Sequence, residues 1–76
     1  MPTYRDILSK IIAQVSPSYF AENKMPRNLM LPHLASEQAG ISLTKDECNE
    51  FAPIFEKMID GAALSAAEEH LLDRQK

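Results

Sequence analysis

The sequence lacks the features that would place the chain in a membrane or outside the cell. Cys48 is the only cysteine among the 76 residues, so an internal disulfide is impossible and a reducing cytoplasm is the expected compartment. No apolar stretch approaches the roughly 18 residues of a membrane-spanning helix, and the opening MPTYRDIL does not resemble an export signal. The sequence therefore predicts a cytoplasmic protein that does not enter the membrane.

A recognisable catalytic or metal-binding motif is also missing. The candidate nucleophile and bases, Cys48, His33 and His70, lie far apart in the sequence with no motif around any of them. Two histidines on separate helices and one thiol do not have the ligand spacing of a zinc site. Cys48 is better interpreted as a small apolar residue of the core. These observations argue against an enzyme, and no cofactor and no metal are predicted.

Basic residues are few, and the net charge of −3 is spread unevenly. Residues 1–40 contain four basic and three acidic groups, whereas residues 41–76 contain four basic and eight acidic groups. Nucleic-acid binding normally requires lysines and arginines clustered against the phosphates, so nucleic acid is not the expected partner. The acidic second half indicates either a solvated helical surface or a surface that meets a basic partner.

The short length limits the size of the core. At 76 residues the chain is expected to form one domain, residues 1–76. A domain of this size draws only about 3–5 kcal/mol of net stability from a single core. Self-association would add stability, so a homo-oligomer is one expectation.

Helical patterning is clearest in LTKDECNEFAPIFEKMIDG, residues 43–61. Thr44 and Glu47 have the spacing of a capping box, so a helix is predicted to begin at Lys45. Gly61 should end it, because glycine adopts the left-handed conformation without a Cβ penalty. Residues that recur at helical spacing form one apolar stripe, which should face the core: Cys48, Phe51, Phe55, Met58 and Ile59, with Ile54 at the margin.

Helices are also expected on both sides of this central one. Thr3 can cap a first helix with an uninterrupted apolar stripe: Tyr4, Ile7, Leu8, Ile11, Ile12 and Val15. A last helix follows a second capping box, Ser65 with Glu68, and its stripe is Ala67, Leu71 and Leu72. Between the first and central helices, the prolines and Gly40 predict a short helix at about 17–24 and an irregular or one-turn connection between Pro26 and Pro32. A third short helix should begin at Pro32 and be ended by Gly40.

These expectations define the fold class. The chain should be a small, all-α, single-domain bundle of four to five short helices, with no sheet. Pro53 lies inside the central helix, where it removes one hydrogen bond and clashes with the preceding turn, so the central helix should be kinked at Pro53.

One stretch resembles a DNA-binding motif. LASEQAGISLTKDECNEF, residues 34–51, resembles a helix-turn-helix, with small residues before a glycine, then Ile-Ser and a second helix. The resemblance implies that the helix beginning KDECNE would read DNA. Its spacing is one residue longer than the family's, and that helix would bring Asp46, Glu47 and Glu50 to the phosphates. A helix-turn-helix regulator is therefore the alternative function.

A second stretch is similar to a subunit of a larger complex. HLASEQAGISLTKDECNEFAPIF, residues 33–55, is similar in its HLA, its LT-DE and the following Phe to the helical part of the small C subunit of glutamyl-tRNA amidotransferase. The similarity covers about a third of the chain, and a capped amphipathic helix accounts for most of it. It implies an accessory-subunit role.

The candidate binding surface is a proline-bounded segment rich in flexible apolar side chains. Such a segment either covers the core or forms an adaptable protein-binding surface. The second interpretation, together with the acidic face of the central helix, predicts these partner-binding residues: Lys24, Met25, Arg27, Leu29, Met30, Leu31, Asp46, Glu47 and Glu50. The predicted function is a non-enzymatic protein-binding module, a small acidic accessory subunit or inhibitor of a larger protein complex.

Overall fold

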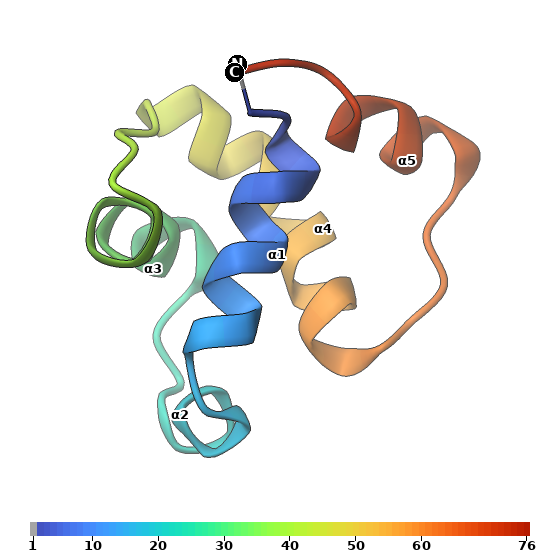
Figure 1. Ribbon diagram of the computed structural model, residues 1–76. Coiled ribbons are helices and arrows are strands. Elements are labelled where there is room, and N and C mark those ends of the chain that lie inside the picture. Colours follow the sequence, from blue (N-terminus) through green and yellow to red (C-terminus); the bar gives the residue numbers. More distant parts are fainter. Residues whose placement is uncertain (1) are drawn as a thin grey trace.

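The computed structural model describes residues 2–76 as a bundle of helices around one core (Figure 1). Five α-helices and one short π-helix make up 71% of the described chain. The all-α fold class is therefore confirmed. Within residues 2–76 the only β-type pairing is a single antiparallel bridge between Thr3 and Gln75. No helix in that range is both long and apolar enough to cross a membrane.

The first, central and last helices begin where the sequence predicts. Helix α1 (Tyr4–Gln14) is capped by Thr3, α4 (Lys45–Asp60) by Thr44 and α5 (Ala66–Leu72) by Ser65. In each case the cap hydroxyl accepts a hydrogen bond from the backbone N–H three residues later, and the acidic side chain at that position accepts one from the N–H of the cap residue. These reciprocal bonds satisfy donors that a helix start otherwise leaves unpaired.

The core is formed by apolar side chains from all five α-helices. Tyr4 of α1 stacks on Phe51 of α4 with ring centroids 4.3 Å apart, and Phe20 meets Phe55 edge to face at 5.8 Å. Every residue of the central stripe is buried or partly buried against this core. The buried apolar residues are Ile7, Leu8, Ile11, Phe20, Met30, Leu31, Leu34, Ala35, Cys48, Phe51, Ile54, Phe55 and Leu72.

The segment after α2 (Pro17–Glu22) differs from the prediction. Helix α3 (Arg27–Leu34) begins directly after Pro26, runs through Pro32 and continues as the π-helix η1 (Ala35–Ala39). The predicted irregular connection and the helix start at Pro32 are therefore wrong. Tertiary packing explains why this segment is helical, because α3 buries three large side chains, Met30, Leu31 and Leu34. Their burial offsets the hydrogen bond that the exposed Pro32 removes.

The two prolines inside helices stand in matching positions. Pro32 and Pro53 each remove the N–H that would bond the carbonyl of the asparagine four residues earlier, Asn28 in α3 and Asn49 in α4. The side chains of these two asparagines meet across the helices, with Asn28 Nδ2 donating to Asn49 Oδ1 at 3.0 Å. Helix α4 runs through Pro53 without interruption, and a kink there stays a prediction.

Two methionines of the same segment should respond differently to truncation. Met30→Ala should lower the free energy of unfolding by about 2–5 kcal/mol, because Met30 is 1% exposed and its loss leaves a cavity. Met25→Ala is the matched control, since Met25 is 46% exposed and its change should stay within about 0.5 kcal/mol. Urea unfolding measures both. Equal effects would contradict the placement of Met30 in the core.

Replacing the proline inside α4 should stabilise the domain. Pro53→Ala restores the missing N–H and removes the clash, and should raise the free energy of unfolding by as much as about 3 kcal/mol. Pro17→Ala is the control, because Pro17 stands at the first position of α2 and its change should stay below about 1 kcal/mol. A loss of stability in Pro53→Ala would show that the surrounding packing requires the proline.

Candidate protein-binding surfaces

The predicted apolar segment does not form one surface, because it is helical. Neighbouring residues of a helix point in different directions, so a run of apolar residues is divided among its faces. Met30 and Leu31 are 1% and 0% exposed and belong to the core. This corrects the expectation that these two side chains reach a partner. For Met30 and Leu31, the alternative interpretation applies: the segment covers the core.

Two large apolar side chains of the segment remain in solvent. Leu29 is 60% exposed and Met25 is 46% exposed, and among residues 2–76 they are the large apolar side chains left exposed. Leu29 belongs to α3, whereas Met25 precedes that helix, so helical spacing does not relate the two side chains. Met25 lies just before α3, where its N–H donates to the Asn23 side chain at 3.1 Å.

Helix α4, which carries the predicted acidic residues, packs against α3. The hydrogen bond between Asn28 and Asn49 joins the two helices at the residues next in sequence to Leu29 and Glu50. Asp46, one turn before Glu50, is also exposed. We call the group Met25, Leu29, Asp46 and Glu50 the outer face. The group is defined by exposure on, or directly before, the two helices that the Asn28–Asn49 hydrogen bond joins.

Glu47 does not belong to this face, because its carboxylate is used inside the domain. It accepts hydrogen bonds from the Lys76 ammonium at 2.8 Å, the Thr44 N–H at 2.9 Å and the Tyr4 hydroxyl. Desolvation raises the pKa of Glu47, but the hydrogen bonds from Lys76, Thr44 and Tyr4 outweigh it and bring the pKa to about 2. The hydrogen bond to Glu47, with burial, raises the pKa of Tyr4 to about 12.

These contacts hold the two ends of the described chain together. The Tyr4 N–H donates to the Arg74 carbonyl at 3.0 Å, and the Lys76 N–H donates to the Pro2 carbonyl at 2.9 Å. Figure 1 shows the two ends side by side. Glu47 is therefore a structural anchor for the segment after α5, and its predicted role in partner binding gains no support from its surroundings.

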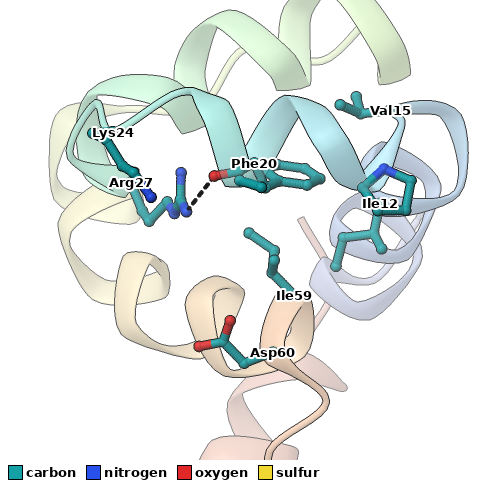
Figure 2. Close-up of a pocket in the computed structure, with 9 residues that line it drawn as sticks. Ile12, Val15, Phe20, Lys24, Arg27, Ile59 and Asp60 are labelled. Carbon is teal, nitrogen blue, oxygen red and sulfur yellow. Dashed lines mark hydrogen bonds between the residues drawn. The ribbon is translucent and has the colours of Figure 1, made fainter.

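Lys24, which precedes α3, and Arg27, the first residue of α3, border a hollow that Leu29 does not line (Figure 2). Its volume is about 360 Å³. The hollow takes apolar lining from α1, α2 and α4: Ile12, Val15, Phe20 and Ile59. We call this site, including Lys24, Arg27 and Asp60 at its edge, the cationic hollow. Sequence patterns mark Lys24 and Arg27, but none of them indicates that residues so far apart in the chain meet.

The catalytic candidates remain separate in the structure. Cys48 is buried, and desolvation raises the pKa of its thiol. His33 lies at the surface 3.3 Å from Glu37 on the same helical segment. Among residues 2–76 no three histidine, cysteine or acidic side chains are grouped so that they could hold a metal ion. The geometry therefore directs attention to the outer face and the cationic hollow.

The contacts of Glu47 predict a pH dependence of stability. Its folded pKa of about 2 lies below the ordinary value of 4.5, so the fold favours the ionised form. The stability that this supplies is present above about pH 4.5 and is lost as the pH falls toward 2. Glu47→Gln should be less stable than the wild type at neutral pH, and the difference should shrink on acidification.

Urea unfolding across this pH range measures the effect. Glu56→Gln is the control, because Glu56 is an exposed glutamate of the same helix that makes no ion pair in the described chain. If the difference in free energy of unfolding between Glu47→Gln and the wild type is the same at every pH, the stabilising role of the ionised Glu47 carboxylate is contradicted.

Comparison with known proteins gives no relative to reason from. The chain matches no protein-family model, no curated protein and no solved structure.

Proposed function

We propose that the chain is a non-enzymatic protein-binding module, a small accessory subunit or inhibitor that docks on a larger protein through the outer face. The observation that supports this proposal is the exposure of Leu29, 60%, and Met25, 46%, whereas the other large apolar residues of the described range 2–76 are buried at least in part. Burial of such a side chain gains about 1.5–3 kcal/mol, and the fold leaves that gain unused at both positions.

The two carboxylates of the outer face suggest that the partner carries basic groups. Asp46 and Glu50 are exposed, and the contact that Glu50 makes with Arg74 is long, 4.0 Å between nitrogen and oxygen. An ion pair of this kind at the surface contributes little to stability. Both carboxylates are thus able to meet basic groups of a partner. Charges at the rim of an interface act mainly on the association rate and on its salt dependence.

The helix-turn-helix alternative receives less support. Helix α3 with η1 and helix α4 flank the turn at residues 40–44, as the resemblance requires. However, the exposed side chains near the start of α4 include Asp46 and Glu50. Carboxylates at the positions that approach the phosphates oppose DNA binding, which depends on neutralisation by lysine and arginine. We therefore propose a protein partner.

A capture experiment with two matched variants tests the proposal. The immobilised chain is exposed to an extract of its native host, and the recovered macromolecules are identified by mass spectrometry. Leu29→Asp places a carboxylate on the outer face, and Ala63→Asp places the same group at an exposed position between α4 and α5. The partner should be recovered by the wild type and by Ala63→Asp. Leu29→Asp should bind the purified partner at least about tenfold more weakly, as expected for an interface anchor.

Three outcomes would overturn the proposal. Equal recovery by both variants would place the interface away from Leu29. Recovery of DNA in place of a protein would favour the helix-turn-helix alternative. A homodimer in sedimentation that Leu29→Asp dissociates would show that the outer face serves self-association.

A further inference from the structure

The cationic hollow is separate from the outer face and has its own chemistry. Its apolar side chains come from three helices, with Ile12 from α1, Phe20 from α2 and Ile59 from α4. Figure 2 shows these side chains around the space, with Lys24 and Arg27 at the left, Ile12 at the right and Asp60 at the lower edge. The volume, about 360 Å³, falls within the range of roughly 300–1,000 Å³ typical of ligand pockets.

Arg27 is the arginine without an acidic partner. Arg5 pairs with Asp73 at 2.9 Å and Arg74 approaches Glu50 at 4.0 Å, but in the described chain no carboxylate lies within 4.0 Å of Arg27. Surface arginines often lack partners, so this alone indicates nothing. Arg27 differs because its guanidinium is partly buried and held in a fixed place at the edge of an apolar hollow.

The guanidinium of Arg27 is positioned by α2 rather than neutralised by it. Nη1 donates to the Asn23 carbonyl at 3.3 Å, and Nη2 donates to the Phe20 carbonyl at 3.5 Å, which is the dashed line in Figure 2. The group also lies over the Phe20 ring, 5.7 Å from its centroid. Nε takes part in none of these hydrogen bonds. Nε and Nη2 therefore retain donors in the planar arrangement that matches a carboxylate.

The other two charged residues of the hollow, Lys24 and Asp60, also lack an ion-pair partner in the described chain. Both are exposed. Asp60 is the last residue of α4, at the negative end of the helix dipole, where a carboxylate is unfavourable by about 0.3–1 kcal/mol. The hollow thus combines apolar side chains, two cations on one side and an acceptor at its lower edge.

We propose that the cationic hollow is a second docking site, which binds a peptide segment of a partner protein that carries a bulky apolar side chain close to a carboxylate. The apolar side chain enters the hollow against Phe20 and Ile59. The carboxylate binds the free donors of Arg27 with Lys24 beside it. Backbone N–H groups of the segment donate hydrogen bonds to the Asp60 carboxylate. A small ligand that carries only a carboxylate has no donor for Asp60, so the proposal is a peptide.

A second copy of this chain is a poor occupant of the hollow. The large apolar side chains that the described surface offers are Met25 and Leu29, which lie in the same segment as Lys24 and Arg27. Docking that segment into the hollow of another copy would bring cations against cations, and like charges facing each other oppose association.

Selection from a library of short random-sequence peptides tests the inference. Peptides displayed on phage are selected against the folded full chain, and the enriched sequences are synthesised and measured by fluorescence anisotropy. We expect enriched peptides to place an aspartate or glutamate within one helical turn of a leucine, isoleucine, methionine or aromatic residue. A synthetic twin with the carboxylate changed to an amide should bind at least about tenfold more weakly, as expected when a charged hydrogen-bond partner is removed.

Matched variants locate the binding. Ala21→Trp fills the hollow from an exposed position that lines it, and should weaken binding at least about tenfold. Ala13→Trp, on an exposed position of α1 that does not line the hollow, should leave it unchanged. Lys24→Glu should weaken binding at least about threefold at low salt and less at high salt, whereas Lys45→Glu should have no such effect.

The test of the cationic hollow is independent of the test of the outer face. Leu29→Asp disrupts the outer face and should leave peptide affinity unchanged, so either site can fail alone. Circular dichroism confirms that each variant is folded. The inference is overturned if no peptide is enriched, if the enriched peptides lack a carboxylate, or if Ala21→Trp binds them as tightly as the wild type.

Discussion

The packing of α3 against α4 is the interaction on which the rest of this domain depends. A chain of 76 residues has few large apolar side chains, and the structure places nearly all of them in one cluster around Phe51 and Phe55. Met30, Leu31 and Leu34 join that cluster from α3. Their burial requires the segment to be helical despite its internal proline, since only a helix turns these side chains to one side.

That same packing produces the two candidate surfaces. Once α3 is a helix with one side in the core, its remaining side chains must leave in other directions. Asn28 meets α4 at Asn49, Leu29 stays in solvent, and Arg27 turns toward α2 and the cationic hollow. The short segment of residues 24–31 therefore contributes to the core, to the outer face and to the cationic hollow.

Charge also has a structural role within the fold. Glu47 caps α4 and also binds Tyr4 and Lys76, so one carboxylate connects the start of the chain, the central helix and the segment after α5. The acidic second half of the chain is thus partly consumed within the domain. Asp46 and Glu50 remain exposed on α4, which reduces the predicted acidic surface to its outer residues.

The sequence by itself determined the all-α class and four of the five α-helices, because capping boxes, apolar stripes and a proline at the first helical position act over a few neighbouring residues. Helix α3 was missed, since Pro32 is a local signal against a helix and the burial that overrides it is a tertiary effect. Only the tertiary structure decided which side chains of residues 24–31 are buried and that Arg27 meets Phe20 and Ile59 at a hollow. Such a site combines residues from separate helices, and no local pattern encodes their meeting.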